Sequence, residues 1–367
     1  MKIVSVIGAR PQFVKAAPVG RALREAGHAE FLVHTGQHYD ANMSDLFFEE
    51  LDIPRPDANL QVGSGSHGAQ TGAMLAGVEE IVAAERPDLV LVYGDTNSTL
   101  AGALAAAKLR VPVAHVEAGL RSFNRAMPEE NNRVVADHLS DVLLCPSRTA
   151  VDNLRAEGIT RGVHLVGDVM YDAVLRFAAR ARTRSDVLAR LGLEPRGYLL
   201  ATVHRAENAD DPARLAEILS AFGELGETVI FPVHPRTRVR LGRGAALGAN
   251  VRAVEAVGYL DMLMLEQHAR MILTDSGGVQ KEAYWLGVPC VTLRDETEWV
   301  ETVEAGWNVL AGASRERIVK AVRELIPAPG ARAPLYGDGR VAARSVGVLE
   351  AAARGAAARG EARAAND

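Results

Sequence analysis

The stretch that decides the fold is Asp88–Gly119, DLVLVYGDTNSTLAGALAAAKLRVPVAHVEAG. It contains two short apolar runs, DLVLVYGD and VPVAHVEAG, with an alanine-rich helical segment between them. Apolar strands that alternate with helices predict a parallel sheet, because parallel strands need a long crossover and are covered on both faces. The stretch therefore predicts one strand–helix–strand unit of a doubly wound α/β domain.

The same alternation continues along the whole chain. The first half adds the runs KIVSVIG, EFLVHTG, DVLLCPS and VHLVGD, and the second half contains YLLATVH, ETVIFPVH, VRAVEAV, RMILTDS, VPCVTLR and WNVLAG. A chain of 367 residues also exceeds the usual size of one hydrophobic core. We therefore predict two Rossmann-like domains of about six strands each, residues 1–172 and 173–339, with a helix at 340–360 that packs back on the first domain.

Composition and charge limit the classes of protein that the chain can be. Hydrophobic residues make up 48% of it, which is typical of a globular protein. A net charge of -5 argues against nonspecific binding to nucleic acid, which needs clustered basic residues. No run approaches the roughly 18 apolar residues of a membrane span, and the first strand begins without a signal peptide. The two cysteines, Cys145 and Cys290, suit buried thiols in a reducing compartment, so we expect a cytoplasmic protein without a membrane partner.

Many of the predicted strands end in polar or charged residues. Asp95, Glu117, His204, His234 and Ser276 each follow an apolar run directly or within two residues. In open α/β sheets the ligand crevice lies outside the carboxyl ends of the strands. We therefore expect these side chains to gather in one region of each domain.

The run TDSGGVQKEA resembles a phosphate-binding turn. A strand ends before Ser276, Gly277 and Gly278 permit a tight turn, and a helix begins with free amide groups that suit an anion. Glu282 lies on the first turns of that helix and could accept hydrogen bonds from ribose hydroxyls. The alternative is an ordinary strand–helix turn that Ser276 caps.

The first strand is followed by IGARPQFVK, which places two cations at a second turn. Arg10 and Lys15 are candidate partners of a diphosphate, because guanidinium offers a fork to two oxygens. The alternative is surface solvation, above all for Lys15. A dinucleotide fingerprint, G-x-G-x-x-G, is absent from this turn, which disfavours NAD as a cofactor.

Carboxylates gather at the ends of two strands and at one helix start. Asp95 is a candidate catalytic acid, and a structural helix cap is the alternative. Glu117 lies in a buried-strand context, where an unpaired carboxylate is costly. Glu129 and Glu130 follow Pro128, which suits the first position of a helix. Acids in the first turn interact favourably with the helix dipole, so the alternative for one of the two is a role in starting the helix and none in catalysis.

Two histidines end strands in the second half, each beside a cation. HRAEN presents His204 and Arg205, and VHPRTR presents His234 and Arg236. This pairing favours anion recognition over a purely structural role. A zinc site is disfavoured because the histidines and cysteines are dispersed, and a serine nucleophile is disfavoured because no G-x-S-x-G elbow occurs.

Taken together, seven motifs resemble the non-hydrolysing UDP-N-acetylglucosamine 2-epimerases, from about residue 1 to residue 326. The motifs are GARPQFVKAAPV, TGQHYDANM, VYGDTNSTLAGALAA, HVEAGLRS, MPEENNR, HRAEN and TDSGGVQKEA. The resemblance implies a fold of glycosyltransferase-B type, in which two Rossmann-like domains face a central cleft. UDP is then held mainly by the second domain and the sugar lies against the first. It implies no metal or redox cofactor, a homodimer, and a role in supplying cell-surface polysaccharide synthesis.

The reaction that the resemblance implies interconverts UDP-GlcNAc and UDP-ManNAc. The proton at C2 is removed as UDP leaves C1, and UDP then re-adds to bound 2-acetamidoglucal after reprotonation on the other face. The acids of the family correspond to Asp95, Glu117 and Glu129, and its key histidine corresponds to His204. The residues implied for UDP binding are Ser276, Gly277, Gly278 and Glu282, with Arg10 and Lys15 near the phosphates.

Departures from the family pattern keep other substrates open. Trp299 in TEWVE stands where better-known members have an arginine, and QHYDANM differs from the motif through which regulated members bind a second UDP-GlcNAc. RPQF and GLRSFN resemble relatives that act on UDP-2,3-diacetamido-2,3-dideoxyglucuronic acid. A hydrolysing epimerase, a glycosyltransferase and a non-catalytic UDP-sugar sensor are the further alternatives.

Overall fold

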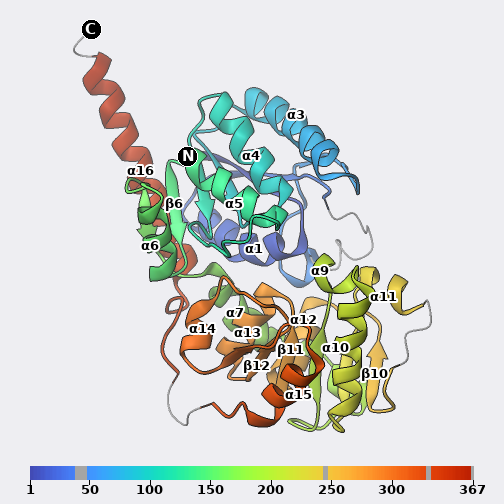
Figure 1. Cartoon of the computed structure of the whole chain (residues 1–367). Coiled ribbons are helices and arrows are strands. Elements are labelled where there is room, and N and C mark those ends of the chain that lie inside the picture. Colours follow the sequence, from blue (N-terminus) through green and yellow to red (C-terminus); the bar gives the residue numbers. More distant parts are fainter. Residues whose placement is uncertain (38–47, 243–246, 328–331, 365–367) are drawn as a thin grey trace. The chain divides into compact units, whose positions relative to one another are not determined.

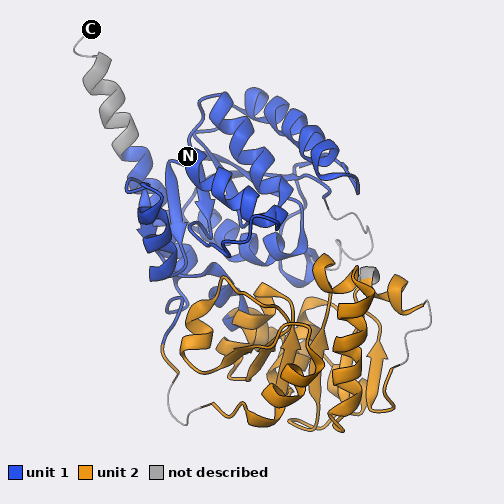
Figure 2. Ribbon diagram, viewed as in Figure 1, with its two compact units in different colours: residues 1–175, 334–367 blue, residues 176–333 orange. Residues whose placement is uncertain are grey.

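The computed structural model describes residues 1–37, 48–242, 247–327 and 332–364. The chain forms two compact units, unit 1 from residues 1–175 with 334–367 and unit 2 from residues 176–333 (Figure 2). The sequence-based limits of 172 and 339 stay a prediction about domains that fold independently. Within the described part of the chain, no helix is long and apolar enough to cross a membrane.

Unit 1 is built on a parallel sheet, seven-stranded in the described residues, in the order β3-β2-β1-β4-β5-β6-β7. All of its strands except β3 coincide with the apolar runs in the sequence, and β3 is only two residues long. The strands are β1 (Lys2–Ile7), β2 (Ala29–His34), β3 (Ala58–Asn59), β4 (Leu89–Tyr93), β5 (Val113–Val116), β6 (Val142–Cys145) and β7 (Val163–Leu165).

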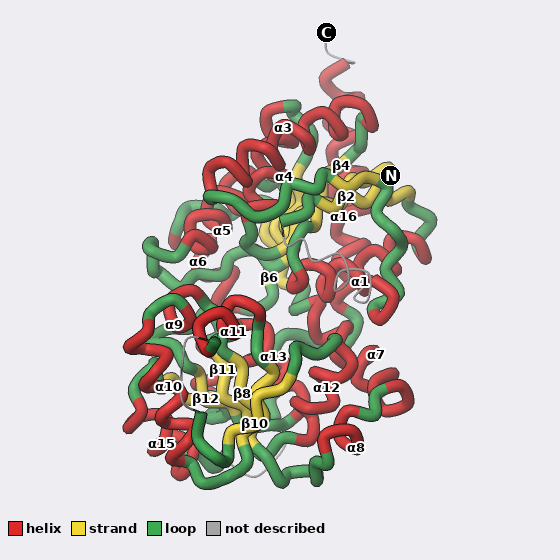
Figure 3. Tube along the Cα trace, turned by 90° about the vertical axis from the view of Figure 1, so that its right-hand side faces the viewer, coloured by secondary structure: helices red, strands yellow, loops and turns green. Residues whose placement is uncertain are grey.

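Helices cover both faces of this sheet (Figures 1 and 3). Helices α3, α4 and α5 lie on one face, and α1 and α16 lie side by side on the other. Valines of β1 and β4 form the core beneath α3 and α4. The helices are α1 (Arg10–Glu25), α3 (His67–Glu85), α4 (Asn97–Lys108), α5 (Pro128–Leu139), α6 (Arg148–Ala156), α7 (Val169–Arg184), which crosses the unit boundary, and α16 (Val341–Ala364).

Unit 2 repeats the plan with a parallel sheet, six-stranded in the described residues, in the order β10-β9-β8-β11-β12-β13. Its strands are β8 (Leu199–Thr202), β9 (Val229–Pro232), β10 (Val251–Val254), β11 (Met271–Thr274), β12 (Cys290–Thr292) and β13 (Asn308–Leu310). Its helices are α8 (Val187–Leu191), α9 (Ala206–Ala209), α10 (Pro212–Glu224), α11 (Pro235–Leu241), α12 (Tyr259–His268), α13 (Gly277–Leu286), α14 (Val300–Glu304) and α15 (Arg315–Glu324). The core of unit 2 joins the sheet to α10 and α15.

Each sheet has one point where the strand order reverses. This switch point lies between β1 and β4 in unit 1 and between β8 and β11 in unit 2. Ligands of such folds bind outside the carboxyl ends of the strands at this point. In unit 1 the chain approaches itself closely there, since a Cβ atom on Gly8 would collide with the hydroxyls of Thr35 and Ser98. The residues that follow β1, β4, β8 and β11 are therefore the candidate ligand-binding residues of the two units.

Candidate active site

A buried ion pair joins α1 to the end of β5 in unit 1. Lys15 and Glu117 are 6% and 8% exposed, and the Lys15 ammonium contacts Glu117 Oε2. The backbone of Gly94, which follows β4, lies against this pair: a Cβ there would come within 2.9 Å of Lys15 Nζ and 3.3 Å of Glu117 Oε2. The surface-solvation alternative for Lys15 is therefore wrong, because its ammonium is buried against a carboxylate, and the cost of an unpaired carboxylate at Glu117 is avoided.

The backbone of Glu117 adopts a left-handed conformation, with φ +73°. Such a conformation is uncommon for a residue with a side chain and is enriched at functional sites. Glu117 N donates to Leu144 O at 3.1 Å, which helps to hold the turn at the end of β5. The strain and the buried ion pair together single out Glu117 as a candidate catalytic acid.

Asp95 follows β4 and pairs with an arginine of α5. Arg133 donates to Asp95 Oδ2 at 2.6 Å and to Glu130 Oε2 at 3.0 Å. The cap interpretation of Asp95 is wrong, because Thr96 caps α4 by accepting from Thr99 N at 3.4 Å. The carboxylate of Asp95 is instead oriented by a cation at the sheet edge.

Of the two acids that begin α5, Glu130 has a structural role. It is buried, and its carboxylate accepts hydrogen bonds from Ser122 N at 2.9 Å and Phe123 N at 3.0 Å. These bonds fix a loop whose tip, Phe123, is 77% exposed and has φ +59°. Glu129 lies half-buried on the same helical turn, which begins at Pro128 as predicted, and its catalytic role stays a prediction.

In unit 2 a fully buried aspartate orients His204. Asp275 accepts from His204 Nδ1 at 2.8 Å, from the backbone amides of His204 and Arg205 at 3.1 and 3.0 Å, and from Asn208 Nδ2 at 3.2 Å. Burial by itself raises the pKa of Asp275, but the charge of His204 and these hydrogen bonds outweigh it and hold the pKa below its usual value. Because Nδ1 faces a carboxylate and carries a proton, Nε2 is the nitrogen that a ligand can reach.

The two strand-terminal histidines of unit 2 lie side by side. The rings of His204 and His234 have centroids 5.6 Å apart and are inclined by 48°. Arg205 stands at the N-cap position of α9. The side chain of Arg236 lies outside the described residues, as do residues 38–47, which hold most of the motif QHYDANM.

The turn after β11 has the predicted form of a helix start. The Ser276 hydroxyl caps α13 by accepting from Val279 N at 3.4 Å, so the cap interpretation is confirmed, while phosphate binding by Ser276, Gly277 and Gly278 stays a prediction. The indole of Trp299 lines this turn, since its Nε1 would lie 3.1 Å from a Cβ atom on Gly277.

A buried cation and a buried acid follow on α13. Lys281 Nζ lies 3.7 Å from the centroid of the Trp299 ring, within the range of a cation–π interaction. Glu282 is turned into the interior and accepts a hydrogen bond from Tyr259 Oη at 2.9 Å. Beside it, burial and then the charge of Glu282 raise the pKa of Glu266 well above its usual value. The ribose-binding role of Glu282 stays a prediction.

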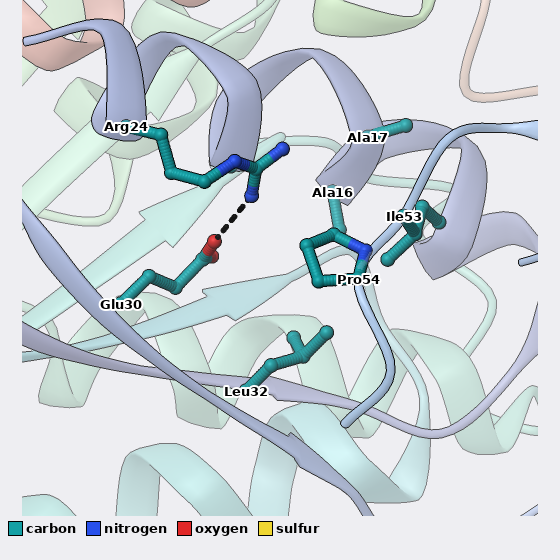
Figure 4. Close-up of a pocket in the computed structure, with 8 residues that line it drawn as sticks. Ala16, Ala17, Arg24, Glu30, Leu32, Ile53 and Pro54 are labelled. Atoms are coloured by element: carbon teal, nitrogen blue, oxygen red, sulfur yellow. Dashed lines mark hydrogen bonds and ion pairs between the residues drawn. The ribbon is translucent and has the colours of Figure 1, made fainter. Parts of the chain in front are cut away.

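Two other kinds of site find little support in the described residues. A cavity of about 10 Å³ between α1 and β2 has room for a single water, and Arg24 and Glu30 form an ion pair at its wall with an N–O distance of 3.3 Å (Figure 4). It contains none of the predicted site residues. Across residues 1–37, 48–242, 247–327 and 332–364, no three His, Cys, Asp or Glu side chains are grouped to hold a metal ion.

Comparison with known proteins gives a consistent result. The family model described as UDP-N-acetylglucosamine 2-epimerase matches residues 21–350. The UDP-N-acetylglucosamine 2-epimerase of Methanocaldococcus jannaschii is 45% identical over 95% of this chain and 99% of its own. The UDP-2,3-diacetamido-2,3-dideoxy-D-glucuronate 2-epimerase of Pseudomonas aeruginosa is 52% identical over 94% of this chain and 98% of its own.

Solved structures agree on the fold. The crystal structure of the Methanocaldococcus jannaschii enzyme in complex with UDP-GlcNAc and UDP has a TM-score of 0.90 and covers 95% of this chain and 99% of that chain. The glycosyltransferase VinC in complex with dTDP has a TM-score of 0.52 at 16% identity, over 96% of this chain and 100% of that chain, which is a likeness of fold alone. The predicted α/β fold of glycosyltransferase-B type, with two Rossmann-like sheets, is confirmed.

Proposed function

The chain belongs to the UDP-N-acetylglucosamine 2-epimerase family, and we propose that it interconverts UDP-GlcNAc and UDP-ManNAc by elimination and re-addition of UDP. As a member of this family it is an isomerase that acts on a nucleotide sugar. The observation that carries the proposal is the buried Lys15–Glu117 pair at the end of β5, with Asp95 at the neighbouring strand end.

The proposed chemistry needs carboxylates of this kind. The proton at C2 of the sugar is not adjacent to a carbonyl group, so its removal must be coupled to the departure of UDP from C1. Because UDP-GlcNAc and UDP-ManNAc differ in the configuration at C2, proton transfer is needed on both faces of the ring. Asp95, Glu117 and Glu129 are the proposed acids and bases, with Glu117 held by Lys15 and Asp95 held by Arg133.

The proposed UDP site lies mainly in unit 2. The amide groups at the start of α13, from Ser276 to Gly278, suit the growing negative charge of the leaving diphosphate. His204, oriented by Asp275, presents Nε2 to the diphosphate and donates to it when the ring is protonated, and His234 and Arg205 lie beside it. From unit 1 we assign Arg10, at the start of α1, to the phosphates, and the predicted place of Lys15 near them stays a prediction. Glu282 is assigned to the ribose.

The test is proton NMR of the purified protein with UDP-GlcNAc in heavy water, without added metal or acceptor. The proposal expects UDP-ManNAc with deuterium at C2 and no accumulation of free UDP. Accumulation of free UDP with ManNAc would support a hydrolysing enzyme instead. An unchanged spectrum, with a known epimerase as positive control, would refute activity on this sugar.

A second substrate is favoured by one comparison. The Pseudomonas aeruginosa relative, named for UDP-2,3-diacetamido-2,3-dideoxy-D-glucuronate, has the higher identity of the two enzymes compared, 52% against 45%. The alternative proposal is therefore the same 2-epimerisation on that uronate. Parallel reactions with both nucleotide sugars at equal concentration decide between them, because kcat/KM ranks competing substrates.

Three further proposals come from the family resemblance. We expect a homodimer, which light scattering coupled to size-exclusion chromatography measures directly. We also expect the protein to work in the cytoplasm and to supply precursors of cell-surface polysaccharides. Loss of ManNAc-type or uronate sugars from surface polysaccharides after deletion of the gene would support the last proposal.

A further inference from the structure

His115 lies on β5, two residues before Glu117, and its ring is fully buried. Both ring nitrogens face oxygen atoms. Nδ1 is 2.7 Å from Asp137 Oδ1 on α5, and Nε2 is 2.7 Å from the backbone oxygen of Gly94. The ring therefore connects α5 to the turn that carries Asp95.

The partners of the ring decide how many protons it carries. A backbone carbonyl can only accept, so Nε2 must bear a proton. Asp137 Oδ2 accepts from Arg121 Nη1 at 2.7 Å and from Gly119 N at 3.1 Å, and the adjacent guanidinium favours the ionised form of the carboxylate. With an ionised carboxylate at Oδ1, Nδ1 must bear a proton as well. The geometry points to a buried imidazolium.

The charges around the ring balance. Arg121 also pairs with Glu157 at 2.7 Å, so Asp137 and Glu157 supply two negative charges and Arg121 one positive charge, which an imidazolium at His115 balances; His138 lies 4.0 Å from Glu157 on its exposed side. Burial raises the pKa of Asp137, but the hydrogen bond and charge of His115 and those of Arg121 hold it below its usual value. The nearby thiol of Cys145 is neutral, because burial above all raises its pKa to about 12. A neutral, fully hydrogen-bonded cluster avoids the cost of an uncompensated buried charge.

The position of the Gly94 carbonyl matters for the acids. Gly94 has φ +62°, a conformation that favours glycine, and its own N–H donates to Val116 O at 3.0 Å, so its peptide groups tie the turn to β5 and to the ring. Its carbonyl carbon is bonded to the nitrogen of Asp95, and its α-carbon lies against Lys15 and Glu117. A hydrogen bond to this carbonyl therefore acts on the two strand ends at once.

We propose that His115 is a positioning residue: as a doubly protonated ring it holds the Gly94 carbonyl and so places Asp95 and the Lys15–Glu117 pair. Its catalytic consequence rests on the proposed function of these acids. The ring does not touch the substrate in this proposal. It sets the geometry of groups that do.

Two substitutions separate the two hydrogen bonds. His115→Gln places an amide nitrogen near the position of Nε2 and keeps a donor for Gly94, whereas His115→Asn places one near Nδ1 and keeps a donor for Asp137. We expect kcat to fall at least about tenfold further in His115→Asn than in His115→Gln, because only His115→Asn leaves the Gly94 carbonyl without its donor. The affinity for UDP, measured by calorimetry, is expected to change less than about twofold in both variants. Equal kcat values in the two variants would overturn the positioning role.

The protonation state has its own test on the wild-type protein. Nitrogen-15 NMR of protein labelled in its histidine rings should show, at pH 7.5, a ring with protons on both nitrogens whose signal vanishes in His115→Gln. A deprotonated, pyridine-like nitrogen assigned to His115 would overturn the imidazolium. This measurement needs no substrate, so it stands even where the protein acts on neither proposed sugar.

The positioning role can also be read without turnover. The backbone amide resonance of Asp95 should shift in His115→Asn and stay near its wild-type position in His115→Gln. An unmoved resonance in both variants would refute the link from His115 to Asp95. If wild-type protein epimerises neither sugar while both NMR results hold, the proposed function fails and the positioning inference survives.

Discussion

Replacing Lys15 by methionine should destabilise unit 1 strongly, because it removes the cation that contacts the buried Glu117 carboxylate. Both residues are less than a tenth exposed, and the contact between them joins α1 to the end of β5. Breaking one partner out of a buried ion pair costs about 3–5 kcal/mol of unfolding free energy. For a unit of roughly 200 residues, each kcal/mol lowers the melting temperature by about 2–4 °C, so we expect a fall of about 6–20 °C.

The matched control is Lys320→Met on α15. Its partner, Glu324, is 4.0 Å away and both side chains are about two-thirds exposed, so the expected loss is about 0.5 kcal/mol or less. Melting is followed by circular dichroism and calorimetry, since two units need not unfold in one step. The double variant Lys15→Met/Glu117→Gln should be more stable than Lys15→Met alone, because it no longer buries a charge. A loss in Lys15→Met as small as that of the control would refute the reasoning.

Other predictions concern the acids and the thiols. Glu117→Gln should lower kcat at least about 100-fold while the UDP affinity measured by calorimetry stays within about threefold; near-normal turnover would contradict the assignment. Asp275 has a pKa below the usual 3.8, so it contributes stability above that pH which is lost as the pH falls through its folded value. Stability of Asp275→Asn, from denaturant titrations, should therefore depend less on pH below about pH 4, and a parallel pH dependence would count against it. Cys145 and Cys290 both have pKa values raised by burial to about 12, so mass spectrometry should find the folded protein unmodified by iodoacetamide at pH 8 and the unfolded chain modified twice.

The strand pattern could be predicted because it is a local property of the chain. Each of the twelve apolar runs became a strand, since a run of buried β-branched residues has few other ways to exclude water in a doubly wound fold. Among the strands of the described residues, β3 alone was missed, because Ala58 and Asn59 carry no strand signal and pair with β2 through position alone. The gathering of polar strand ends was predictable for a related reason: parallel strands bring their carboxyl ends to one edge.

The partners of the site residues could not be predicted in the same way. Lys15 and Glu117 are 102 positions apart, and Asp95 and Arg133 are 38 apart, so no local spacing brings them together. Asp95 and Thr96 are both good helix caps; Thr96 caps α4, and Asp95 pairs with an arginine from another helix. The sequence thus predicted a cap at the start of α4, but the residue that caps it is Thr96 and not Asp95.

The backbone conformations of Glu117 and Gly94 were not predictable from the sequence pattern. A glycine would adopt φ +73° at position 117 without strain, whereas a glutamate there costs on the order of 1–3 kcal/mol. The side chain that this conformation carries faces Lys15 in the interior. Gly94 gives the converse case, because a side chain there would occupy the space of the same ammonium. The strand ends of β5 and β4 therefore both accommodate the buried Lys15–Glu117 pair: Glu117 does so with a strained backbone, and Gly94 does so by having no side chain.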